Sequence, residues 1–406
     1  MDNTKKNFIW NMIGTTINAF NSLFFMIMAT RINGIDDAGI FTFAFSTALL
    51  FNIIGVYSGR VYQVTDKTEA TDKDFIISKF ITCFVMLIVS ILFVSINNYC
   101  FYKSSIILLL CFLKMLEAFS ETIYAIFQRK DSLYLTGISL TLKSLINLFI
   151  FFIIDLLTHN LVIAIIGMII TYGLIMFFYD YINIKKKIDI QKEYEKERII
   201  TILKKGFGAF IISFLTLYLI NSSKYVIDYL LVEKYQTIFG ILLMPATVIL
   251  LFTQFIIHPF LNLITNCVHD KKYDELKKII FKFLGVMILF GIVVIIVAYF
   301  LGIPVLELIY GISLNDYKKG FMVIMIGGVL YGMSSILSSI LIAMRHLNIQ
   351  VIIYSVVAIV ITVIEYFLIN IYGVMGACYA YFIMTFIVLI MFLVATFIFI
   401  KRDSSV

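Results

Sequence analysis

The sequence predicts an all-α membrane protein of about twelve transmembrane helices, and three observations lead to this fold class. Hydrophobic residues make up 62% of the chain and charged residues 14%, whereas soluble domains average about 45–50% and about 25%. The apolar runs at 81–96, 284–301 and 351–371 are suited to cross a hydrocarbon layer about 30 Å thick as helices. Lysine and arginine gather in alternate connections, as they do between membrane spans.

The polar clusters of the chain mark the ends of the predicted spans. The limits are 8–30, 40–61, 76–96, 105–127, 133–154, 161–183, 207–231, 238–264, 280–301, 319–343, 349–370 and 375–399. The first stretch follows Lys5 and Lys6, as a signal peptide would, but it runs on without a small-residue cleavage site. We therefore expect it to remain in the protein as a helix.

The distribution of positive charge predicts the orientation. One set of connections, together with both chain ends, holds 24 of the 32 lysines and arginines, and the opposite set holds five. Because positively charged connections stay in the cytoplasm, both termini are predicted to be cytoplasmic. The longest polar connection then separates six spans from six. This predicts an N-terminal six-helix bundle at 1–184, a cytoplasmic linker at 185–205 and a C-terminal six-helix bundle at 206–406.

Several chemistries lack their sequence signals. The outer connections are short, which argues against a membrane glycosyltransferase or polysaccharide polymerase and predicts a protein that is not an enzyme. The segment GGVLYGMS has Met333 where a phosphate-binding loop needs lysine, so Gly328 and Gly332 are predicted to pack helices closely. The cysteines and histidines show no metal-ligand spacing. We expect no metal, no cofactor and no nucleic-acid partner.

Charged and polar side chains inside the predicted spans are the strongest functional signal. Each charge left at the lipid midplane costs about 2.5–3.5 kcal/mol on insertion scales. Lys114, Glu117 and Glu121 share one stripe of the fourth span. Three other spans have a similar polar face. On the fifth span it consists of Thr136, Ser139, Lys143 and Asn147, and on the seventh of Asn221, Lys224 and Asp228. On the first span it consists of Asn11, Thr15, Asn18 and Ser22. Together they predict a water-filled cavity between the two bundles, and hence a solute pathway.

The charges within one span have two open interpretations. Lys114 is within reach of Glu117 and Glu121 along its helix, and Lys224 is within reach of Asp228. Such pairs stabilise helices and helix contacts without any role in transport. The alternative is that the cations bind an anionic substrate.

The remaining cations differ in their surroundings. Lys143 has no acidic residue within one turn of its own helix, which favours an anion-binding role. Arg31 and Arg60 stand at the ends of the first two spans. There they either anchor helices to lipid headgroups or contact substrate.

Four acidic residues are candidates for ion coupling: Glu117, Glu121, Asp228 and Glu365. A buried carboxylate can take up a proton near neutral pH, so these groups are candidates for binding H⁺ or Na⁺ during transport. For Glu365, alone in the outer part of the eleventh span, a hydrogen bond between helices is an equally good explanation.

Four segments carry a resemblance to a known family: RINGIDDAGIFTFAFSTALLFNIIGVYSGRVYQVTD at 31–66, ETIYAIFQRKDSL at 121–133, SKYVIDYLL at 223–231 and LELIYG at 306–311. With the order of spans along nearly the whole chain, they resemble the Wzx-type flippases for lipid-linked oligosaccharides. These belong to the multidrug/oligosaccharidyl-lipid/polysaccharide (MOP) exporter superfamily.

The resemblance implies two six-helix bundles around a cationic central cavity, working by alternating access. The implied substrate is an undecaprenyl-diphosphate-linked repeat unit, moved to the outer leaflet of a bacterial inner membrane for O-antigen or other polysaccharide biosynthesis, beside a polysaccharide polymerase. Lysine and arginine suit phosphate, and amides suit sugar. The implied substrate-binding residues are Arg31, Arg60, Lys114, Lys143, Lys224, Asn147 and Asn221. One departure is that several acids accompany these cations.

Competing interpretations remain open. A MATE-like, cation-coupled drug antiporter shares the architecture and favours an acidic pocket. The four acidic candidates, Glu117, Glu121, Asp228 and Glu365, are consistent with this alternative. A major-facilitator transporter also has six plus six spans, but GRVYQVTDKTEATDK lacks the glycine and arginine pattern expected after its second span. A membrane polymerase or glycosyltransferase is the alternative from another class.

Overall fold

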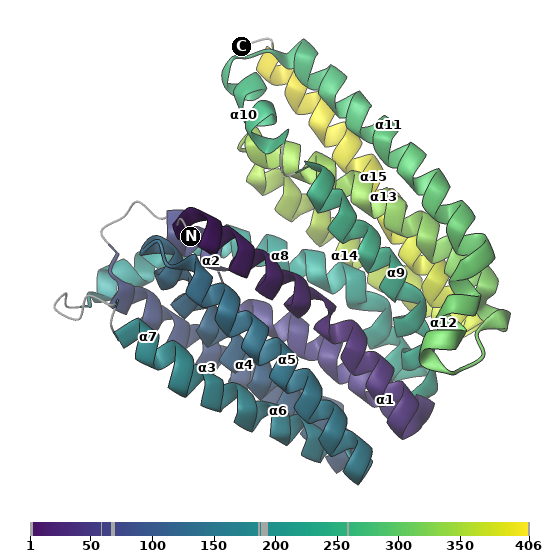
Figure 1. The fold of residues 1–406 in the computed structure, drawn as a ribbon. Helices are drawn as coiled ribbons and strands as arrows, with labels where there is room; N and C mark the ends of the chain where they lie inside the picture. The colour runs from purple at the N-terminus through teal and green to yellow at the C-terminus, as the bar shows by residue number, and fades with distance from the viewer. Residues whose placement is uncertain are drawn as a thin grey trace. The chain divides into compact units, whose positions relative to one another are not determined.

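Helices account for nearly all of the structure, a computed structural model that describes residues 3–57, 59–65, 70–185, 187, 194–257 and 260–404. No strand occurs among these residues. The chain divides into two compact units, Met1–Phe214 and Leu215–Val406. Within each unit long helices pack side by side (Figure 1).

The N-terminal unit contains eight helical elements and the start of a ninth. They are α1 (Asn3–Val56), α2 (Gly59–Thr65), α3 (Asp72–Asn97), α4 (Phe101–Arg129), α5 (Leu133–Thr158), α6 (Leu161–Ile175), the π-helical segment η1 (Met176–Tyr181), α7 (Ile182–Lys185) and the first part of α8 (Lys196–Leu230). In this unit α1 packs on α4 and α5, and α6 packs on α4 and α5.

The C-terminal unit holds the rest of α8 and the remaining elements. They are α9 (Lys234–Ile257), α10 (Leu261–His269), α11 (Tyr273–Val297), the π-helical segment η3 (Ala298–Gly302), α12 (Ile303–Tyr310), the short 3₁₀ helix η4 (Asn315–Tyr317), α13 (Lys318–Ala343), α14 (Leu347–Tyr372) and α15 (Val374–Ser404). Here α13 packs on α9 and α15. A Cβ added at Gly328 would lie 2.9 Å from that of Ala246 in α9, which confirms the predicted close helix packing.

The predicted membrane-spanning architecture is confirmed. Ten helical stretches of the described chain are long and apolar enough to cross a membrane. The first of them, Thr4–Val56, is long enough to contain two spans. The 29-residue α4 is also long enough to cross, and only its charged residues keep it out of the ten. With these two adjustments the described helices match the twelve predicted spans.

Gly34 is the point where α1 reverses. Along a straight helix Asn21 and Asn52 would lie about 46 Å apart, yet both line the same cavity. Gly34 has φ 87° and ψ −179°, a conformation open essentially only to glycine. The reversal brings two spans back along each other, so both halves of α1 can present side chains to one site.

The second predicted span ends earlier than expected, at Val56 instead of residue 61. Tyr57 adopts φ 54°, and a separate helix, α2, follows. Lys79 of α3 donates from Nζ to the backbone carbonyls of Gly55 (3.1 Å) and Val56 (2.6 Å). These last carbonyls of α1 have no partner within the helix, so the lysine caps it. Arg60 consequently belongs to α2.

The start of α8 is fastened to the N-terminal unit. Asp74, in the capping box of α3, accepts hydrogen bonds from the backbone N–H of Glu195 (2.9 Å) and from Nε of Arg198 (2.9 Å). Of the predicted linker at 185–205, residues 186 and 188–193 lie outside the described residues, and α8 already begins at Lys196.

A close backbone contact sets α1 against α5. A Cβ added at Gly137 would lie 2.2 Å from the carbonyl of Trp10, and one added at Gly14 would lie 2.4 Å from the carbonyl oxygen of Gly137. Only glycine permits this approach. The contact places the polar faces of α1 and α5 next to each other.

We predict that Gly34→Ala lowers the stability of the protein by about 1–3 kcal/mol, because alanine must adopt the backbone conformation that only glycine tolerates. Unfolding in detergent measures the effect. Gly173→Ala is the matched control, since Gly173 is helical and an added Cβ there meets nothing within 4 Å; it should be neutral or slightly stabilising. Equal unfolding midpoints for the two variants would contradict the role given to Gly34.

Candidate functional site

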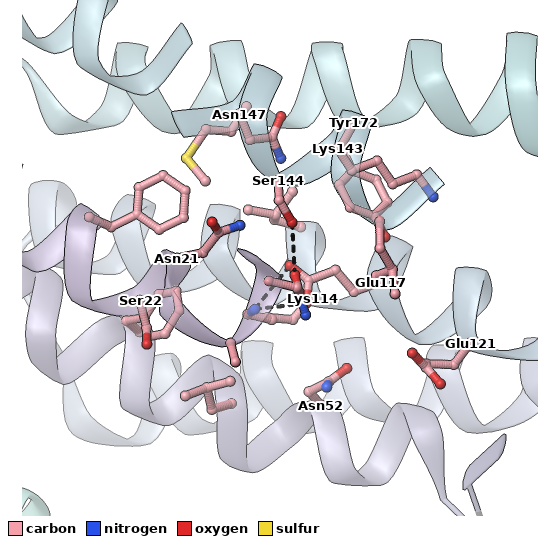
Figure 2. Close-up of a pocket in the computed structure, with 18 of the residues that line it drawn as sticks. Asn21, Ser22, Asn52, Lys114, Glu117, Glu121, Lys143, Ser144, Asn147 and Tyr172 are labelled. Atoms are coloured by element: carbon pink, nitrogen blue, oxygen red, sulfur yellow. Dashed lines mark hydrogen bonds and ion pairs between the residues drawn. The ribbon is translucent and has the colours of Figure 1, made fainter. Parts of the chain in front are cut away.

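A polar cavity of about 440 Å³ lies inside the N-terminal unit. Side chains from both halves of α1 and from α4, α5 and α6 surround it, and Figure 2 shows several of them around the hollow. The polar residues of its lining are Asn18, Asn21, Ser22, Asn52, Lys114, Glu117, Glu121, Tyr124, Lys143, Ser144, Asn147 and Tyr172. A cavity of this size lies within the range of about 300–1,000 Å³ usual for ligand sites.

Lys114 and Glu117 of α4 form an ion pair in the wall. Nζ of Lys114 donates to both carboxylate oxygens, at 2.9 and 2.7 Å, and lies 4.9 Å from the ring centre of Phe45. The two residues are one turn apart, so the helix itself brings them together. This pairing is one of the two interpretations left open by the sequence.

Lys143 of α5 is the centre of a buried network. Its Nζ donates to Oδ2 of Asp180, to Oγ of Ser120 (2.7 Å) and to Oη of Tyr124 (3.1 Å). The ammonium group also lies 4.3 Å from the ring centre of Tyr172. Lys143 is 2% exposed and Asp180 is fully buried. Lys143 has no acid within one turn of its own helix, as the sequence shows, but η1 supplies one.

Glu121 faces a third cation. Nε of Arg60 lies 3.9 Å from Oε2 of Glu121, and both side chains are partly exposed. Arg60 itself is not part of the cavity lining. The distance between the two groups is long and both are partly exposed, so this pair is weaker than the two lysine pairs.

The neutral groups of the lining divide into bonded and unbonded amides. Oδ1 of Asn147 accepts from Thr171 of α6 (2.7 Å), and Oδ1 of Asn18 accepts from Ser144 (3.3 Å). The Oδ1 atoms of Asn21 and Asn52 are buried and accept no hydrogen bond from the described chain.

Comparison with known proteins shows which fold this is. No family model matches the chain. The chain is 25% identical over 398 residues to the capsular polysaccharide biosynthesis protein CapF of Staphylococcus aureus, covering 95% of this chain and 97% of that protein. An inward-facing MATE-family multidrug transporter of the MOP superfamily has a TM-score of 0.73 at 13% identity, with 97% of this chain and 99% of the other covered. The lipid II flippase MurJ has a TM-score of 0.73 at 16% identity, with 98% and 90% covered.

The chain has the fold of the MOP-superfamily transporters. These structural neighbours are transporters and flippases and are not enzymes. The fold that the resemblance implied is thereby confirmed, since the MATE transporters and MurJ have it.

The MOP fold brings together five of the predicted site residues. Lys114, Glu117, Glu121, Lys143 and Asn147 all line the cavity of the N-terminal unit. The polar stripe of the fourth span therefore points inward and not at lipid, as its spacing predicts.

The other predicted site residues do not line this cavity. Arg31 is exposed in α1, next to the reversal. In the C-terminal unit Asn221 donates to the carbonyl of Leu217 (3.0 Å), and the backbone carbonyl of Lys224 accepts from Gln236 (2.6 Å). Asp228 is half-buried in α8. A cavity shared by both halves of the chain stays a prediction.

Glu365 of α14 has hydrogen-bonding partners in α8. Its Oε1 accepts from Ser222 (2.7 Å) and Ser223 (2.8 Å), and the residue is 1% exposed. Oε2 is buried and has no hydrogen-bond partner among the described residues. The hydrogen bond between helices that the sequence left open is present.

Sequence reasoning missed several polar residues that shape the site, among them Asp180, Asn52 and Asn21. Asp180 stands alone among aromatic residues at the end of the sixth span, and Asn52 stands alone in an apolar run, so neither belongs to a stripe. Asn21 lies one turn from Asn18 and could have been found from that spacing.

We predict that Lys143→Met and Asp180→Leu each destabilise the protein by about 3–5 kcal/mol, because each leaves a buried charge without its partner. The double variant should be far less destabilised than the sum of the two, and a double-mutant cycle of unfolding in detergent measures the difference. Lys114→Met is the control. It should destabilise the protein less, because the partner left behind, Glu117, has a side chain that is 29% exposed. Additive single effects would contradict the coupling.

Proposed function

We propose that this protein moves undecaprenyl-diphosphate-linked oligosaccharide repeat units from the inner to the outer leaflet of a bacterial plasma membrane, by alternating access, for the synthesis of a surface polysaccharide. The observation that carries the proposal is the amide- and hydroxyl-rich cavity among membrane-spanning helices, with its cations balanced by acids. A polar glycan fits such a lining. The likeness to a capsular polysaccharide protein over nearly the whole chain supports the same substrate class.

The diphosphate requires cationic contacts, because phosphate oxygens bind most strongly to lysine and arginine. The proposed contacts are Arg31, Arg60, Lys114, Lys143 and Lys224, with Asn147 and Asn221 toward the sugar. For Lys114 and Lys143 a phosphate contact requires the exchange of a carboxylate partner.

The proposed setting follows from the charge of the connections. The lysine-rich side, with both termini, is assigned to the cytoplasm of a bacterium. The lipid tail of the substrate remains in the bilayer, and a polysaccharide polymerase is the proposed recipient of the flipped unit.

A MATE-like drug antiporter is the second candidate, because Glu117 and Glu121 line the cavity and a MATE transporter shares the fold. A site for cationic drugs needs carboxylates that are not already neutralised. Glu117 is held by Lys114, and Glu121 faces Arg60. The lining therefore favours the glycan.

We predict that the protein restores surface polysaccharide to a bacterial strain that lacks its own repeat-unit flippase, measured by staining of extracted polysaccharide. Ala19 lines the cavity, so Ala19→Trp places a large side chain there. This variant should abolish the restoration at unchanged protein level. Ile91→Trp, on the exposed face of α3, is the matched control and should restore export. Drug efflux without polysaccharide export would favour the antiporter instead.

We further propose that Glu365 takes up a coupling proton, with Glu117, Glu121 and Asp228 as the other candidate groups for H⁺ or Na⁺. Its second carboxylate oxygen has no partner in the described chain, and a neutral carboxyl group is far less costly there than a charged one.

Glu365→Gln keeps the shape and the acceptor for Ser222 and Ser223 but cannot exchange a proton. We predict that it abolishes the dependence of export on a proton gradient, measured with an imposed gradient in inverted vesicles. Ser222→Ala is the control, since it removes one hydrogen bond and leaves the carboxyl group. Gradient-dependent export that is unchanged in Glu365→Gln would exclude the coupling role.

A further inference from the structure

Two lysines of the described chain line the cavity of the N-terminal unit, and their ion pairs differ in how easily a ligand could separate them. Lys143 is 2% exposed and its partner Asp180 is fully buried. The ammonium group of Lys143 also donates to Ser120 and Tyr124. Separation of this pair leaves a buried charge without its partner, which is strongly destabilising.

The pair of Lys114 and Glu117 can be separated at lower cost. Both residues line the cavity, their side chains are 10% and 29% exposed, and Figure 2 shows them at the hollow. Both hydrogen-bond acceptors of the Lys114 ammonium group within the described chain are the carboxylate oxygens of Glu117, at 2.9 and 2.7 Å. A rotation of the Glu117 side chain would thus release Lys114. The carboxylate could stay hydrated afterwards, because it is partly exposed already.

The carboxylate of Glu117 binds Lys114 as a phosphate group would. A phosphate carries the same two features, a negative charge and adjacent acceptor oxygens, and lysine binds both groups through charge-assisted hydrogen bonds. Without substrate, Glu117 therefore occupies the position on Lys114 that a phosphate group could take. A sugar can use the neutral part of the lining as it stands, whereas a phosphate can use Lys114 only after Glu117 has left it.

We propose that Glu117 is an internal competitor of the substrate: it binds Lys114 while the cavity is empty and is displaced when a phosphate group of the lipid-linked substrate arrives. This role rests on the proposed function, in which the substrate carries a diphosphate. The competitor lowers the affinity for the diphosphate and favours its release, because the ion pair re-forms as the phosphate leaves. A transport site needs binding that is weak enough for the substrate to depart. The role gives one reason why acids accompany the cations of this cavity.

The competition makes phosphate binding depend on pH. A protonated Glu117 cannot hold Lys114 as an ion pair, so a proton on Glu117 and a phosphate on Lys114 favour each other's binding. A displaced Glu117 also lies near a second carboxylate, which a proton on either would relieve. The affinity for the diphosphate should therefore rise as the pH falls. The charged and titratable groups around Glu117 are Glu121 and Tyr124 of α4, Lys143 of α5 and Tyr172 of α6, with Asp180 of η1, Arg60 of α2 and Lys79 of α3 beyond them. The side chains that α1 contributes to the lining in the described chain are uncharged.

The test measures the affinity of the full chain for undecaprenyl diphosphate carrying one N-acetylglucosamine, by native mass spectrometry in slightly acidic and slightly alkaline buffer. Both phosphates of this probe are esterified, so its own charge is the same in the two buffers. Glu117→Gln keeps the shape of the side chain and removes its charge. In alkaline buffer it should bind the probe about three- to tenfold more tightly than the wild type does, the value of a partly exposed ion pair. Its affinity should be the same in both buffers, whereas that of the wild type should be higher in the acidic one.

Lys114→Met shows whether the gain passes through Lys114. It should weaken binding, and the double variant Lys114→Met/Glu117→Gln should bind no more tightly than Lys114→Met alone. Glu275→Gln is the matched control, since Glu275 is an exposed acid at the start of α11, and it should bind like the wild type in both buffers.

Two results would overturn the competitor: a Glu117→Gln variant that binds no more tightly than the wild type in alkaline buffer, or a gain that persists in the double variant. Either result leaves the flippase proposal standing, whereas a wild-type chain that does not bind the probe at all contradicts the flippase proposal itself. Unfolding midpoints identify a misfolded variant, and Glu117→Ala then replaces Glu117→Gln with the same expected gain.

Discussion

A charged side chain in the interior of a membrane must find a partner or water, and the N-terminal unit is arranged around this requirement. Lys143 meets it most completely, with Asp180, Ser120 and Tyr124 around its ammonium group. These partners come from α4 and from the π-helical segment after α6, so one buried cation fixes three helices against one another. Short π-helical segments are frequent at functional sites. Here such a segment contains Asp180, the acid that neutralises Lys143.

The same requirement explains the cavity of the N-terminal unit. Polar faces on α4 and α5 cannot turn to lipid, and they need a third polar surface to enclose them. The first half of α1 supplies it, because the Gly14–Gly137 contact lets its backbone touch α5. The reversal at Gly34 then adds the second half, with Asn52. Two glycine-dependent features of the backbone thus bring these polar side chains around one cavity.

Much of this could be predicted from the sequence, for identifiable reasons. The spans follow from length and apolar character, and the inward face of α4 follows from the 3.6-residue period of Lys114, Glu117 and Glu121. A search for apolar segments with few charges passes over α4, whereas the spacing of its charges identifies it. The partner of Lys143 could not be predicted, since Asp180 is 37 residues away and no local spacing rule relates positions on different helices. The early end of the second span depends on a cap from Lys79, which is likewise a tertiary contact.

Because MATE transporters and MurJ share this fold, the fold cannot decide between a drug and a lipid-linked glycan, and the decision falls to the lining. A cationic drug would bind to carboxylates that have no ion-pair partner in the protein. An isolated diphosphate would bind to lysine or arginine side chains that have no such partner. The cavity of the N-terminal unit presents neither, since Lys114, Glu117 and Lys143 are held in pairs. The neutral polar side chains of its lining are amides and hydroxyls, such as those of Asn18, Ser144 and Asn147. The ligand best matched to that wall is large, polar and uncharged where it touches the protein, and the sugar part of a lipid-linked repeat unit has those properties.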